Sequence, residues 1–212
     1  TDLVPGNIGL LLLYLARSRP TCPRWWLIEY DVVYTGHWRS FFEHFRRSDS
    51  DLLGTTLHPY PRLPEYHWWE SFRAPEPVRE TDLLRGLFPV MRVSRDALRS
   101  LDRAYADGWA GHHEVVLPTA LRSRGLEIED LGGEGPFVRP DNENRFYTNT
   151  PGRTSLAPGT FVYRPARRWP GLRPDTLWHP VKPTAGRLGQ YLKLARAHFA
   201  RWKTESTERG QG

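Results

Sequence analysis

Apolar residues dominate the chain between residues 25 and 36, in a run that favours a β-strand. The run is rich in Trp, Ile, Val and Tyr. Pro23 and Gly36 bound it, as proline and glycine commonly do at the ends of a strand. Glu29 and Asp31 interrupt it. Residues two apart on a strand point to one face, so we expect both carboxylates to project together, about 7 Å apart along the chain. This predicts a divalent-metal site or, alternatively, the water-facing side of an edge strand.

The next segments alternate between helix and strand periodicity. Residues 8–17 read as a short helix that Pro20 ends, and 37–47 place aromatic residues at helical spacing. Residues 49–57 read as a second strand beside the acidic one. A β-α-β order predicts a parallel sheet with a right-handed crossover. Ligands of such sheets bind beyond the carboxyl ends of the strands, where the two carboxylates are expected.

An aromatic loop and a capped helix follow. Residues 60–77 are proline-punctuated and carry Trp68 and Trp69, which are expected either to stack on a sugar or to form a lid folded over the core. Residues 87–93 predict a strand, and Ser94 is a plausible N-cap for the helix after it. Arg95, in the first turn of this helix, can help to bind an anion or can be a solvated surface charge.

A second set of polar residues, at 112–114, precedes an apolar run in a segment that extends to residue 122. The pattern predicts that His112, His113 and Glu114 begin a helix, with Pro118 kinking it or starting a new turn. A carboxylate tuned by burial can accept a proton near neutral pH, so Glu114 is a candidate general base. The alternative is that it compensates the helix dipole.

The last third of the chain is less regular. Residues 132–158 are rich in Gly, Pro, Asn and Thr and predict a mobile loop with little core, and 160–164 predict a strand. In the extended segment 175–182, His179 is a possible third metal ligand and Lys182 a possible phosphate ligand. Residues 185–202 predict an amphipathic helix. We expect one domain over 1–202 and a disordered tail over 203–212.

Composition narrows the class of protein. A charged fraction of 25% and a mean hydropathy of −0.60 argue against a membrane span, and the single Cys22 excludes an internal disulfide framework. A cytoplasmic location is therefore expected, with attachment at a membrane surface as the alternative. The net charge of +6 comes from scattered arginines, which suit a phosphorylated small substrate as well as nucleic acid, or solubility alone.

Four motifs, taken in order, resemble the nucleotide-sugar-dependent glycosyltransferases of the GT-A fold. They are Glu29-Tyr30-Asp31 after an apolar strand, Gly36-x-Trp38, Gly111-His-His-Glu114 and Trp178-His179-Pro-Val-Lys182. The resemblance implies a Rossmann-like α/β fold with a mixed, mainly parallel sheet flanked by helices. The acidic motif is Glu-x-Asp where Asp-x-Asp is commoner in that class. The family's amino-terminal strand is also expected to precede residue 1.

The resemblance also implies a set of roles. Glu29 and Asp31 would hold Mn²⁺ or Mg²⁺ on the donor diphosphate, and His179 would complete the metal shell. Lys182 and Arg95 would stabilise the phosphates, and Glu114 would act as base in an inverting transfer to an acceptor hydroxyl. Trp68 and Trp69 would hold the acceptor glycan.

Two other classes compete with this interpretation. A metal-dependent phosphodiesterase or nucleotidyltransferase would use similar ligands, although its sites usually carry more acidic residues. A non-catalytic carbohydrate- or nucleic-acid-binding module would use the aromatic loop and the arginines. The glycosyltransferase interpretation predicts a nucleotide-sugar donor and a hydroxyl acceptor as partners, with no nucleic acid and no transmembrane segment.

Overall fold

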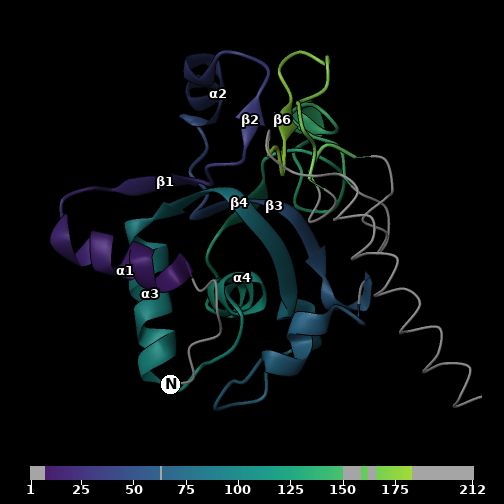
Figure 1. Cartoon of the computed structure of the whole chain (residues 1–212). Helices are drawn as coiled ribbons and strands as arrows, with labels where there is room; N and C mark the ends of the chain where they lie inside the picture. The colour runs from purple at the N-terminus through teal and green to yellow at the C-terminus, as the bar shows by residue number, and fades with distance from the viewer. Residues whose placement is uncertain (1–7, 63, 150–158, 162–165, 183–212) are drawn as a thin grey trace, which may run out of the picture.

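A central sheet with helices on both faces forms the described part of the chain (Figure 1). The computed structural model describes residues 8–62, 64–149, 159–161 and 166–182. The sheet contains β1 (Arg24–Ile28), β3 (Leu52–Pro59), β4 (Leu84–Ser94) and β5 (Ile128–Asp130). A separate two-stranded sheet contains β2 (Val33–Tyr34) and β6 (Leu177–Trp178).

Antiparallel pairing dominates the central sheet, so the predicted mainly parallel sheet is wrong. The strand order is β1-β4-β3-β5, and β4 is antiparallel to both β1 and β3; only β3 and β5 pair in parallel. The strands β1 and β3 do run in the same direction, as the β-α-β prediction requires, but β4 lies between them. The coarser prediction of an α/β fold with flanking helices is confirmed.

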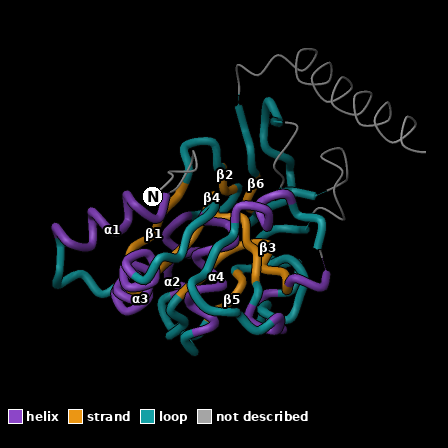
Figure 2. Tube along the Cα trace, turned by 90° about the horizontal axis from the view of Figure 1, so that it is seen from below, coloured by secondary structure: helices purple, strands orange, loops and turns teal. Residues whose placement is uncertain are grey.

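The helices bury their apolar faces on opposite sides of the sheet. Helices α1 (Ile8–Ser18), α3 (Arg95–Ala106) and α4 (His113–Ser123) share one hydrophobic cluster with β4. Helix α2 (Trp38–Phe45) packs on the other face, where Phe41 and Phe45 are buried. Figure 2 shows the same elements from below. The predicted helices at 8–17 and 37–47 are therefore confirmed.

The N-cap that the sequence predicts for helix α3 is confirmed. The Ser94 side chain accepts a hydrogen bond from the Ala97 backbone N–H at 2.9 Å, which makes it the N-cap of α3. Helix α4 begins after His112 and continues through Pro118, so the proline neither ends it nor starts a new element. Short 3-10 turns connect the elements, at Tyr60–Arg62, His67–Ser71, Glu80–Asp82 and Pro140–Asn142.

The segment after β5 contributes to the core, contrary to the prediction of a loop with little core. Phe146 and Tyr147 are buried in the cluster that α2 covers. Phe161 forms isolated bridges with Asn149 and His179, whereas most of the predicted strand at 160–164 lies outside the described residues. The predicted helix at 185–202 and the tail at 203–212 also lie outside them. No helix in the described ranges is long and apolar enough to cross a membrane.

Candidate metal and acid-base site

Glu29 and Asp31 lie in a turn and not on a strand, which corrects the predicted geometry. Strand β1 ends at Ile28. The Glu29 backbone N–H still donates to the Pro89 carbonyl at 2.7 Å, and the Val32 N–H donates back to the Glu29 carbonyl at 3.1 Å. The turn, and not the alternation of a strand, thus brings the two carboxylates together.

His179 completes a cluster with these two carboxylates. Its Nε2 lies 3.5 Å from Glu29 Oε2 and 3.7 Å from Asp31 Oδ1, and one ligand atom from each residue lies within 4.8 Å of the others. The antiparallel pairing of β2 with β6 brings His179 alongside the acidic turn. The Val181 N–H donates to the Asp31 carbonyl at 2.8 Å, which holds the segment after His179 against the acidic turn.

The donor set fits a divalent cation. Asp31 and His179 are only 4% and 5% exposed, and Asp31 Oδ1 is a buried oxygen with no hydrogen-bond partner among the described residues. Two carboxylates and one imidazole are ligands that Mn²⁺ accepts, and a ligand bond would satisfy this oxygen. Glu29, Asp31 and His179 are therefore the residues that would hold the metal.

Lys182 lies at the edge of the same cluster. Its Nζ is 3.2 Å from Asp31 Oδ2 and 5.6 Å from the centre of the Tyr30 ring. Burial acts to lower the pKa of Lys182, but the interactions with Asp31 and Tyr30 outweigh it and raise the pKa. The side chain is 41% exposed, so the ammonium group can also face a solvent-side anion.

Glu114 is a buried carboxyl group at the start of α4, with 8% of its surface exposed. Burial raises its pKa to about 7, and hydrogen bonds from Tyr66 and Trp68 partly oppose this shift. The negative charge of Glu29 raises the pKa further, so Glu114 lies within electrostatic reach of one carboxylate of the Glu29, Asp31 and His179 cluster. A pKa near 7 is suited to a general base at neutral pH.

The aromatic segment holds Glu114 from the side of the 3-10 turn His67–Ser71. The Trp68 ring stacks on His112 with ring centroids 3.9 Å apart and an angle of 2° between the planes. Both Trp68 and Trp69 are half-buried against the cluster beneath α4, which is the lid interpretation of this loop. One face of Trp68 is covered by the imidazole, so only its other face could stack on a sugar.

A glycine permits this close approach. Gly111 has a φ of +127°, and a Cβ at this position would lie 2.6 Å from the Ser71 carbonyl oxygen. The next residue, His112, donates its backbone N–H to Ser71 Oγ at 3.0 Å. The glycine therefore allows the aromatic segment to lie directly against the residues that begin α4.

Arg95 is not brought to the cluster. Its Nη1 donates to the Pro20 carbonyl at 3.0 Å, and Ser94 pairs with Arg24 at the opposite end of β1 from Glu29. Five residue steps separate Arg24 from Glu29, which is about 17 Å along an extended chain. This position fits the alternative of a surface charge that supports the chain before β1.

Two further residues act on Glu114 through contacts that have no signal in the sequence. Tyr66 donates to Glu114, and the Arg85 guanidinium lies 4.8 Å from the centre of the Tyr66 ring. The charge of Arg85 lowers the pKa of both groups, although burial keeps the pKa of Tyr66 raised overall. Contacts between a loop, a strand and a helix depend on the tertiary structure, so residue spacing alone does not reveal them.

Comparison with protein-family models and with curated proteins finds no match for this chain.

Proposed function

We propose that this chain is an inverting, metal-assisted glycosyltransferase of the GT-A type, which transfers a sugar from a nucleotide-diphosphate sugar to an acceptor hydroxyl. One observation carries the proposal. A three-ligand cluster with a buried, unsatisfied carboxylate oxygen lies within electrostatic reach of a buried carboxyl group whose pKa is about 7. A metal-assisted, inverting transfer from a diphosphate donor to a hydroxyl uses both parts, a cation for the leaving group and a base for the acceptor.

The proposed roles follow from the positions of the side chains. A divalent metal bound by Glu29, Asp31 and His179 would neutralise the charge that develops on the departing diphosphate. Lys182 would add a positive charge beside the same group, because its ammonium lies against Asp31 at the edge of the cluster. Glu114 would accept the proton of the attacking hydroxyl, and its fraction in the ionised form would rise through pH 7.

The number of ligands favours this function over a metal-dependent phosphodiesterase. Two-metal hydrolases hold a pair of ions about 4 Å apart and need more carboxylates and imidazoles than a one-metal site. In the part of the chain that the structure describes, Glu29, Asp31 and His179 form the one group of this kind. A nucleotide-sugar donor, by contrast, completes the metal shell with its own phosphate oxygens.

Calorimetric titration of UDP, GDP and dTDP tests the proposal, with Mn²⁺ or with a chelator. We expect one nucleotide to bind in a metal-dependent manner to the wild type and not to Asp31→Ala. The matched control is Asp96→Ala, which removes an exposed carboxylate that pairs with Arg99 on α3. Binding that persists in Asp31→Ala, or in the presence of chelator, would refute the assigned metal site. No binding to the folded wild type would contradict the proposed function for this chain.

A further inference from the structure

A polar cavity of about 610 Å³ lies beside the C-terminal end of α2, away from the residues assigned above. The end of α2 and the turn after it form one wall, and β5 and the 3-10 turn Pro140–Asn142 contribute the others. The cavity shares no lining residue with the metal-ligand cluster, Lys182 or Glu114. Its volume lies within the range of small-molecule sites, about 300 to 1,000 Å³.

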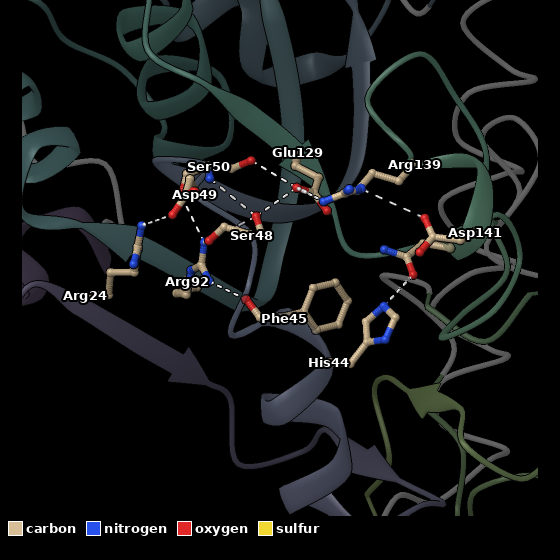
Figure 3. Close-up of polar contacts among 11 residues, drawn as sticks. Arg24, His44, Phe45, Ser48, Asp49, Ser50, Arg92, Glu129, Arg139 and Asp141 are labelled. Atoms are coloured by element: carbon tan, nitrogen blue, oxygen red, sulfur yellow. Dashed lines mark hydrogen bonds and ion pairs between the residues drawn. The ribbon is translucent and has the colours of Figure 1, made fainter.

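Buried hydrogen bonds fix the walls (Figure 3). Arg92 is 3% exposed and donates to the backbone carbonyls of Phe45 at 2.7 Å and Ser48 at 2.8 Å, which holds the turn after α2 against β4. His44 Nε2 lies 2.7 Å from Asn142 Oδ1, which ties α2 to the opposite wall. The cavity is therefore built by the fold before any ligand enters.

Glu129 presents a carboxylate oxygen without a hydrogen-bond partner. The residue is 7% exposed, and its Oε2 accepts hydrogen bonds from Ser48 Oγ at 2.8 Å and Ser50 Oγ at 3.0 Å. Its Oε1 is buried and has no hydrogen-bond partner in the described ranges. Arg139 lies 4.0 Å from Oε2, which is too long for a hydrogen bond (Figure 3). A hydroxyl group of a ligand would supply the missing donor.

The arginines of the cavity differ in their partners. Arg46 pairs with Glu43 at 3.5 Å, and Arg139 lies between two carboxylates. Arg47 and Arg145 line the cavity but form no ion pair with another described residue, and Arg145 lies 5.0 Å from the centre of the Phe146 ring. A guanidinium group without a carboxylate partner binds a phosphate through two parallel hydrogen bonds.

We propose that this cavity binds a sugar phosphate, with the phosphate on Arg47 and Arg145 and a sugar hydroxyl donating to Glu129. The arginines require an anion, and Glu129 requires a hydroxyl donor. The cavity therefore selects for one molecule that carries both groups. Inorganic phosphate lacks the hydroxyl-bearing body, and a neutral sugar lacks the anion. The site is separate from the proposed transferase centre, so binding here does not require the metal ligands.

Calorimetry in the presence of a chelator tests the site with three probes: glucose 6-phosphate, glucose and inorganic phosphate. We expect glucose 6-phosphate to bind at least about tenfold more tightly than either of the others, because it alone carries both the phosphate and the sugar hydroxyl. The double substitution Arg47→Ala, Arg145→Ala should weaken this binding by about tenfold or more. Both side chains are exposed, so the variant is expected to fold.

Three further variants make the result specific. Glu129→Gln should weaken the binding of glucose 6-phosphate while leaving the affinity for inorganic phosphate unchanged. Arg99→Ala removes an exposed arginine on α3, and Asp31→Ala removes a ligand of the other site; neither should change the binding. Absence of glucose 6-phosphate binding, or an equal affinity for inorganic phosphate, would overturn the proposal. Binding that survives the double arginine substitution would do the same.

Discussion

Replacing Glu114 with Gln is expected to stabilise the protein at pH 8 and to change its stability little at pH 4.5. The folded protein keeps a proton on Glu114 up to a pKa of about 7, whereas the unfolded chain loses it near the ordinary value of 4.5. Between these values the folded state binds more protons than the unfolded state. Stability therefore falls as the pH rises through this window, and above it the native state carries the full cost of a buried charge.

The size of the effect follows from the difference between the two pKa values. The shift of 7 − 4.5, or 2.5 pH units, corresponds to about 3 kcal/mol at about 1.4 kcal/mol per unit. The gain in Glu114→Gln is thus about 3 kcal/mol at pH 8. Asp130 has its pKa raised to about 7 as well, chiefly by burial, but it is present in both proteins and its contribution cancels from the difference.

Urea unfolding of wild type and Glu114→Gln at pH 4.5, 6, 7 and 8 measures this difference. Gln keeps a carbonyl that can accept the hydrogen bond from Tyr66, so the substitution mainly removes the charge. Glu43→Gln is the matched control for the loss of one carboxylate, at an exposed position on α2. A difference in the free energy of unfolding that stays constant from pH 4.5 to pH 8 would refute the raised pKa of Glu114.

Three further predictions concern the supports of the two sites. Arg92→Met should lower the free energy of unfolding by at least about 3 kcal/mol in urea titrations, because three backbone carbonyls lose a charged donor; less than 1 kcal/mol would contradict it. Tyr66→Phe should raise the pKa of Glu114 in an NMR titration, because the tyrosine hydrogen bond lowers it; an unchanged midpoint would show that the bond is not formed. Gly111→Ala should destabilise by at least about 2 kcal/mol, since its Cβ would lie 2.6 Å from a carbonyl oxygen, whereas Gly108→Ala meets open space and should cost less; equal losses would exclude the clash.

Local features of the fold could be predicted from the sequence, because their causes lie within a few residues. The spacing of aromatic residues in α2 and the cap at Ser94 are examples, since both depend on one turn of helix. The sheet order could not be predicted in this way. Strand β4 is an apolar run buried along most of its length and pairs on both edges, and nothing in its own residues shows that it inserts between β1 and β3.

The same distinction between local and nonlocal causes applies to the candidate site. Glu29 and Asp31 are conspicuous because they interrupt an apolar run, and His179 because it follows one, so residue type alone singles them out. Their arrangement is nonlocal: a turn after β1 supplies the carboxylates, and the pairing of β2 with β6 carries the imidazole across about 150 residues of chain. A substitution that weakens the β2–β6 pairing should therefore separate His179 from the carboxylates without touching any of the three. The metal affinity that we propose depends on this short two-stranded sheet as much as on the ligands themselves.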